Sequence, residues 1–179
     1  MLKLVIPDTE FYDSGKEEFV YLKRREISLE HSLVSVSKWE SKFKRSFLND
    51  GPKTTSEIIE YVKCMTITQN VDPLVYRCLN VEALEAIKKY IAAPMTATTF
   101  SNQGRSPSRE IITSELIYYW MVALQIPSEY EKWHLNRLLT LIQVCNSYNQ
   151  PPKKMSKSDI IRNNDALNAA RRAAMRTRG

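Results

Sequence analysis

Few side chains in this sequence could do chemistry, and their spacing matches no catalytic motif. Two histidines, His31 and His134, are the residues whose unperturbed pKa lies close to neutral pH. His31 falls between a strand pattern and a helix pattern, and His134 follows Trp133 in an apolar helix pattern. Because the spacing identifies no serine or cysteine as a catalytic partner of either imidazole, we expect both histidines to have structural roles.

The cysteines and the closely spaced glutamates also indicate no reactive centre. Cys64, Cys78 and Cys145 lie far apart without C-x-x-C spacing, so we expect free buried thiols in a reducing, intracellular compartment. Glutamates recur three residues apart on helix faces that we expect to be solvated: Glu57, Glu60, Glu82 and Glu85. The sequence has no H-E-x-x-H, D-x-D, G-x-x-x-x-G-K or G-x-G-x-x-G motif. We therefore expect no enzyme activity, no metal site and no cofactor.

The positive charge of the chain belongs to its C-terminal end. Lysine and arginine total 26 against 20 aspartates and glutamates, a formal net charge of +6. Residues 153–179 hold eight bases and two acids, so residues 1–152 are neutral overall. Hydrophobic residues make up 43% of the chain, which is typical of a globule, and no apolar run is long enough to span a membrane. Met1–Pro7 lacks the features of a signal peptide.

The periodicity of the apolar residues predicts a mainly α fold with a small β element at the N-terminus. Leu2–Ile6 is predicted as a strand, Asp8–Lys16 as a turn, and Glu18–Glu30 as a short sheet or hairpin. Five to six helices and a short helical turn over residues 70–79 are predicted, the helices in these ranges: 32–43, 55–67, 81–92, 109–125, 128–148 and 157–176. We expect a single helical domain over residues 1–150 and a basic, helix-prone tail over residues 151–179.

Capping residues support four of the predicted helix starts: Thr54 with Glu57, Asn80, Ser108, and Ser128 with Glu131. The helix over residues 109–125 is apolar over most of its surface, so we expect it to be the central element of the core. The helix over residues 128–148 is also strongly apolar, and we expect the two to pack as an antiparallel pair.

Two regions of the predicted globule are candidates for a partner-binding surface. Tyr118, Tyr119 and Trp120 are adjacent in a helix that turns about 100° per residue, so one aromatic ring must point outward. We expect Tyr118 or Tyr119 to mark that edge. The other candidate is the segment from Met95 to Phe100, which has the composition of a strand and precedes a polar loop over residues 101–108.

The C-terminal tail leaves three interpretations open. Its apolar side chains could dock into the groove of a partner protein: Ile160, Ile161, Leu167 and Met175. Its bases could contact phosphates or an acidic partner: Lys153, Lys154, Lys157, Arg171, Arg172 and Arg176. No aromatic residue interleaves with these bases and the body is neutral, which argues against nucleic acid. The third interpretation is a solvated helix without a partner.

Five segments, taken in order, resemble those of one group of phage proteins: Leu29–Glu40, Cys64–Pro73, Ala93–Ala97, Glu115–Trp120 and Pro151–Ser156. Through them the chain, from about Leu29 to Ser156, resembles the tail assembly chaperones of long-tailed, non-contractile phages. The resemblance implies a mostly helical, non-enzymatic protein of the host cytoplasm that is absent from the mature virion. Such proteins are thought to coat the long, hydrophobic tape measure protein while tail tube subunits assemble around it.

The resemblance also implies that a longer form can be made by a programmed ribosomal frameshift. Codons for Pro152-Lys153-Lys154 can form a slippery run, so we expect any shift near residues 150–155. Self-association is open, since it would hide an apolar client-binding surface when no client is present. Two other functions remain as alternatives: a nucleic-acid-binding accessory protein that acts through the tail, and a structural component of the virion neck or tail.

Overall fold

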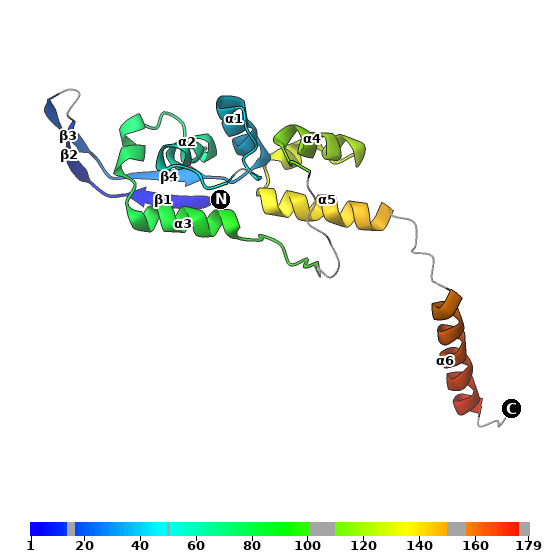
Figure 1. Ribbon diagram of the computed structural model, residues 1–179. Coiled ribbons are helices and arrows are strands. Elements are labelled where there is room, and N and C mark those ends of the chain that lie inside the picture. The colour runs from blue at the N-terminus through cyan, green and yellow to red at the C-terminus, as the bar shows by residue number, and fades with distance from the viewer. Residues whose placement is uncertain (14–16, 50, 101–109, 150–156, 176–179) are drawn as a thin grey trace. The chain divides into compact units, whose positions relative to one another are not determined.

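The computed structural model describes residues 1–13, 17–49, 51–100, 110–149 and 157–175, and it confirms the mainly α fold with a small β element (Figure 1). The chain forms two compact units, Met1–Asn146 and Ser147–Gly179. The helices and strands of the described residues are β1 Leu2–Ile6, β2 Thr9–Asp13, β3 Glu18–Leu22, β4 Arg25–Leu29, α1 Leu33–Phe43, α2 Thr55–Met65, the 3-10 helix η1 Pro73–Cys78, α3 Val81–Ala92, α4 Ser114–Ala123, the 3-10 helix η2 Ser128–Lys132, α5 Leu135–Asn149 and α6 Lys157–Met175.

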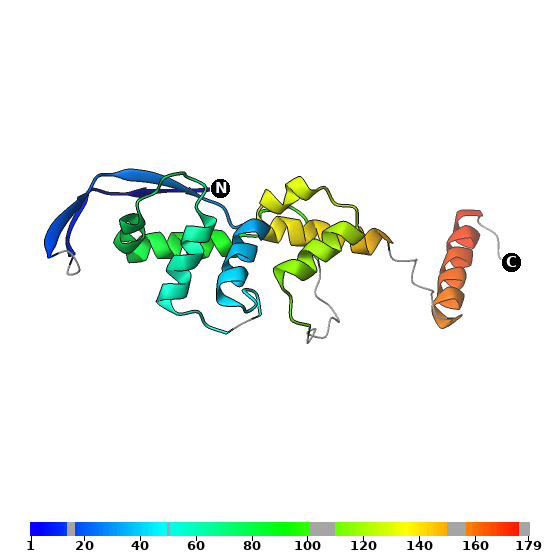
Figure 2. The same cartoon turned by 90° about the horizontal axis from the view of Figure 1, so that it is seen from above.

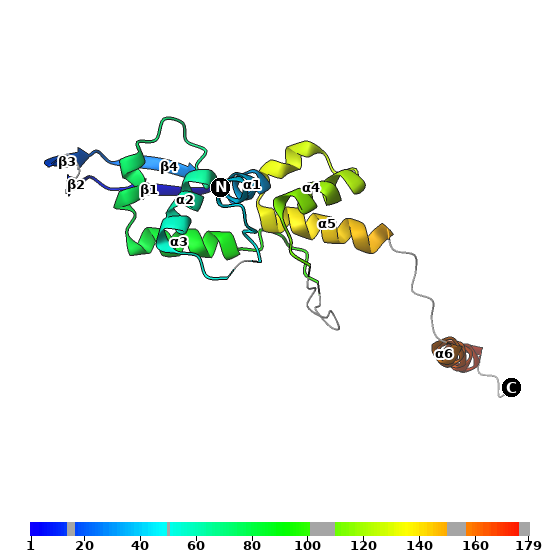
Figure 3. The same cartoon turned by 45° about the horizontal axis from the view of Figure 1, so that its top comes forward.

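The four strands form a single bent hairpin. β1 pairs with β4 in antiparallel register from Leu2↔Leu29 to Ile6↔Arg25, and β2 pairs with β3 from Thr9↔Leu22 to Asp13↔Glu18. The two ladders keep the same register, since neither strand has an extra residue between them. The bend lies at Asp8, whose Oδ1 accepts hydrogen bonds from the Arg24 backbone N–H at 2.8 Å and the Tyr21 hydroxyl at 3.1 Å. We call β2 and β3 the hairpin arm. In three views the arm extends beyond α2 and α3 (Figure 1, Figure 2 and Figure 3).

The predicted turn over Asp8–Lys16 is wrong for residues 9–13, which form β2. The physical reason is the cross-strand partner: Tyr12 pairs with Phe19, and such aromatic pairs stabilise a ladder that local turn residues do not reveal. Residues 14–16 lie outside the described part of the chain.

Local capping explains where α1, α2 and α3 begin. The Ser32 side chain accepts from the Ser35 N–H, and Ser35 in turn bonds to the Ser32 N–H. The predicted capping box of Thr54 and Glu57 opens α2, and Asn80 caps α3 as predicted. Each cap supplies acceptors for backbone N–H groups that have no partner within the helix.

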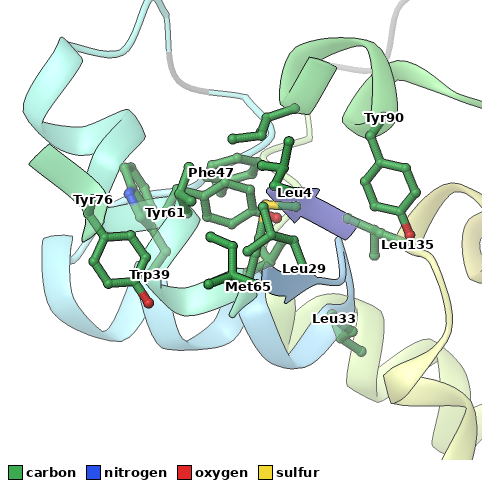
Figure 4. Packing of buried hydrophobic residues seen from close by; sticks show 14 of the residues in the cluster. Leu4, Leu29, Leu33, Trp39, Phe47, Tyr61, Met65, Tyr76, Tyr90 and Leu135 are labelled. Atoms are coloured by element: carbon green, nitrogen blue, oxygen red, sulfur yellow. The ribbon is translucent and has the colours of Figure 1, made fainter. Parts of the chain in front are cut away.

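The hydrophobic core is centred on α1, α2 and the paired strands β1 and β4 (Figure 4). Trp39 is fully buried, its Nε1–H donates to the Glu57 carbonyl at 3.1 Å, and its ring packs against Phe47. Phe47 stacks on Tyr61 with ring centroids 4.0 Å apart. Other large buried side chains of this cluster are Leu4, Leu29, Leu33, Met65, Tyr76, Tyr90 and Leu135.

The prediction for residues 109–125 is wrong both in where the helix begins and in its place at the centre of the core. α4 begins at Ser114 with Thr113 as its cap, and Ser108 lies outside the described residues. Residues 110–113 lie outside the helix because the Ile112 N–H donates to Asn49 Oδ1 at 2.7 Å and the Ser114 N–H to Glu40 Oε2 at 2.7 Å. Only one side of α4 is buried, through Ser114, Ile117 and Met121.

The predicted single helix over 128–148 is divided into η2 and α5. The break occurs because the backbone at His134 pairs with Ser32, and the Leu135 N–H donates to the His31 carbonyl at 2.7 Å. Residues 95–100, all described, form no strand, and Met95 has a φ of 50°. The loop predicted over 101–108 lies outside the described residues. No helix in the described parts of the chain could cross a lipid bilayer.

Candidate functional site

The two histidines, which lie far apart in the sequence, meet in the core of the first unit. Their ring centroids are 5.1 Å apart in an edge-to-face arrangement. His31 Nδ1 is hydrogen-bonded to the Tyr61 hydroxyl. His134 Nε2–H donates to the Tyr90 carbonyl at 3.1 Å, so its Nδ1 is an acceptor. That buried atom has no hydrogen-bond partner among the residues that the structure describes. The pair joins the start of α1 to the start of α5.

Burial determines the charge of this pair. Burial, together with the neighbouring His134, lowers the pKa of His31 to about 3. Burial also lowers the pKa of His134, although the hydrogen bond to the Tyr90 carbonyl and the charge of Glu30 oppose the shift. Both imidazoles are therefore neutral at pH 7, and His31 is far too weak a base for proton abstraction at that pH. The arrangement fits the structural roles expected for both residues.

The cysteines are free thiols, as the sequence predicts, but they are half-buried rather than buried. Burial raises the pKa of Cys64 and of Cys78, which keeps both thiols protonated and weakly nucleophilic near neutral pH. Within the described ranges, no group of three or more histidine, cysteine, aspartate or glutamate side chains is arranged to hold a metal ion.

The helix predicted in the tail is present as α6, and every residue of it is exposed. Ile160, Leu167 and Ala174 recur every seven residues and therefore lie along one side of the helix. Ile161 and Met175 are exposed as well, and so are the described bases Lys157, Arg162, Arg171 and Arg172. Lys153, Lys154 and Arg176 lie outside the described residues.

The two candidate tyrosines on α4 differ in their exposure to solvent. Tyr118 is half-buried, and its hydroxyl donates to Glu131 Oε2 at 2.9 Å; burial together with this carboxylate raises the pKa of Tyr118 to about 12. Tyr119 is 66% exposed, and with Glu115 and Val122 it lies on the outward side of the helix. Tyr118 thus ties α4 to η2, and Tyr119 is the residue available to a partner.

The segment from Met95 to Phe100 places its two apolar residues differently. Met95 is exposed at the rim of a pocket of about 300 Å³ that Glu30, His134 and Arg137 also line. Phe100 is half-buried. Because this segment forms no strand, it has no ladder edge to offer an extended partner.

The hairpin arm carries an exposed aromatic surface that sequence analysis missed. Its register places Tyr12 opposite Phe19 and Glu10 opposite Tyr21, so these four residues share one side of the two-stranded sheet. Tyr12 is 52%, Phe19 72% and Tyr21 61% exposed. We call these three residues the aromatic face. The alternation of Phe19 and Tyr21 is a signal for it, but the composition of residues 8–16 predicts a turn where the structure has the pairing strand β2.

Three exposed surfaces with large apolar side chains therefore stand out in the described chain: the aromatic face, the outward side of α4, and α6. Exposed apolar side chains grouped on one element are typical of surfaces that contact another protein. No protein-family model, no curated protein and no solved structure matches this chain.

Proposed function

We propose that this protein is a phage tail assembly chaperone that acts without catalysis. It binds the tape measure protein and keeps it in solution during tail morphogenesis, in the host cytoplasm, and it is absent from the mature virion. The proposal joins the resemblance carried by residues 29–156 to the surfaces that the fold leaves exposed. Tail tube protein is the second partner that the resemblance implies.

The observation that carries the proposal is the composition and exposure of α6. In this helix of 19 residues every residue is exposed, so no side chain of it is packed into a core. An isolated helix of this length is marginal in water, so a partner that covers Ile160 and Leu167 would stabilise it. An amphipathic helix of this kind can lie along an apolar stretch of a client and present its bases to water.

Co-expression with the tape measure protein tests this function. We expect the chain to raise the soluble fraction of the tape measure protein and to co-purify with it. Ile160→Asp combined with Leu167→Asp should reduce the co-purified amount about ten-fold, because two charges would enter the apolar contact. The readout is quantitative gel analysis of the soluble and affinity-purified fractions.

A matched control introduces the same charges on the opposite side of α6. Ala169→Asp combined with Ala173→Asp should leave the co-purified amount of tape measure protein close to that of wild type, because these residues face away from Ile160. A tape measure protein that stays insoluble with the wild-type chain, and elutes in no complex with it, refutes the proposed function.

The exposed bases of α6 favour a second candidate, a nucleic-acid-binding accessory protein. In that case the chain binds duplex DNA with an affinity that falls steeply with salt, by about 0.9 in log–log slope for each phosphate contact. Arg171→Ala combined with Arg172→Ala should then lower the slope by about two. Fluorescence anisotropy over a salt series gives the slope. Mass spectrometry of purified particles tests the remaining alternative, a structural neck or tail component.

A further inference from the structure

We propose that the hairpin arm of one copy binds the C-terminal half of α6 from a second copy, and that two copies exchange these contacts reciprocally. The occupant of the aromatic face is then residues 166–175 of the other molecule. This inference does not rest on the proposed function, since it follows from two surfaces with complementary charge and apolar content.

The aromatic face is held in place by contacts within the hairpin. Tyr12 and Phe19 pack edge to face with ring centroids 5.3 Å apart. The Tyr21 hydroxyl donates to Asp8 Oδ1, and that carboxylate raises the pKa of Tyr21. Aromatic side chains that are already ordered lose little entropy when a partner covers them, which favours binding. A two-stranded hairpin is marginal on its own in water, so a covering helix would also stabilise the arm.

The charges of the two surfaces are opposite. Glu10 shares the side of the aromatic face, Glu17 directly precedes β3 and is exposed, and neither β2 nor β3 contains a basic residue. α6 has no acidic residue after Asp165, whereas Arg171 and Arg172 follow it and are exposed. Leu167 and Arg171 lie four residues apart, so one side of the helix presents an apolar and a basic group together. An acidic, aromatic surface fits a basic, apolar helix.

The lengths of the two elements are compatible. Five-residue strands make the arm about 17 Å long, and ten residues of helix extend about 15 Å. A single helix on a two-stranded ribbon covers less area than most stable interfaces. A reciprocal exchange forms the same contact twice around a two-fold axis, which doubles the buried area and closes the assembly as a dimer.

Charge reversal on the full-length chain tests this exchange. The arm variant combines Glu10→Lys with Glu17→Lys, and the helix variant combines Arg171→Glu with Arg172→Glu. Each variant alone should dimerise about ten-fold more weakly than wild type, since like charges then meet. An equimolar mixture of the two variants should recover a heterodimer, because every arm then meets a helix of opposite charge. Analytical ultracentrifugation over a concentration series measures each dissociation constant.

Matched aromatic variants test the apolar part of the contact. Phe19→Ser should weaken the dimer about ten-fold, whereas Tyr148→Ser, at an exposed ring on α5, should leave it unchanged. Circular dichroism checks that each variant is folded. A wild-type chain that stays monomeric at all concentrations overturns the inference, and so does a dimer that both charge reversals leave intact or a mixture that fails to recover it.

Discussion

Replacing Glu40 by leucine is expected to lower the free energy of unfolding by about 3 to 5 kcal/mol. Glu40 is buried on α1, where Oε1 accepts from the Phe47 N–H at 2.8 Å and Oε2 from the Ser114 N–H at 2.7 Å. Leucine leaves both buried donors without an acceptor. It also removes a negative charge from the N-terminus of α4, where the helix dipole favours one. Chemical denaturation at neutral pH, followed by circular dichroism, measures the loss.

Two further variants make this prediction specific to the hydrogen bonds. Glu40→Gln keeps one carbonyl oxygen as an acceptor, so the free energy of unfolding should fall roughly half as much as it does for Glu40→Leu. Glu85→Leu makes the same chemical change at an exposed position of α3 and should shift the free energy of unfolding by less than about 0.5 kcal/mol. Equal losses for Glu40→Leu and Glu85→Leu would show that Glu40 has no special role in joining α1 to α4.

The part of the fold that could be predicted from sequence is the part that local interactions determine. α2 begins where Thr54 and Glu57 cap each other, and α3 begins after Asn80, whose Oδ1 accepts from the Ala83 N–H at 2.8 Å. Both interactions span three residues and leave a sequence signature. The strand β1 likewise follows from its own apolar run, which ends at Pro7.

The two misplaced helix starts occur where a distant residue takes over a backbone group. A helix pattern runs through residues 109–113, but Asn49 and Ser46 bond Ile112 on both its N–H and its carbonyl, which keeps it out of α4. A helix pattern also runs through residues 128–148, but the His31 carbonyl takes the Leu135 N–H. Sequence periodicity contains no information about such long-range partners, and it presents Glu40 as one more polar residue of a helix.

The candidate surfaces were predictable to different degrees. The exposure of α6 follows from its composition, since alanines and charged residues offer little apolar surface to bury. Tyr118 and Tyr119 could not be distinguished, because the side of α4 that faces the core is set by Ile117 and Met121 in their tertiary contacts. Predicting the aromatic face requires both strands of the arm, and β2 begins in a segment rich in turn residues, which hides it.

Acidification is expected to destabilise the first unit well above the pH at which carboxylates titrate. The pKa of His31 is about 3 in the folded protein and near 6.5 in the unfolded chain, so below pH 6.5 only the unfolded chain binds that proton. The free energy of unfolding therefore falls as the pH falls, and His31 alone accounts for about 2 kcal/mol between about pH 7 and pH 5. His134 acts in the same direction, since its pKa is also lowered. Denaturant titrations at several pH values measure the slope.

The His31→Gln variant separates this effect from the rest of the protein. Glutamine does not titrate and can still accept a hydrogen bond from the Tyr61 hydroxyl. The slope of the free energy of unfolding against pH, between about pH 5 and pH 7, should therefore decrease by the amount that corresponds to about one bound proton. The pKa values of Glu57, Glu60 and Glu115 are lowered in the fold, which confines the stability lost through these carboxylates to lower pH. If wild type and His31→Gln have the same slope in that window, His31 titrates alike in the folded and unfolded chains. The buried pair would then not be the source of acid sensitivity.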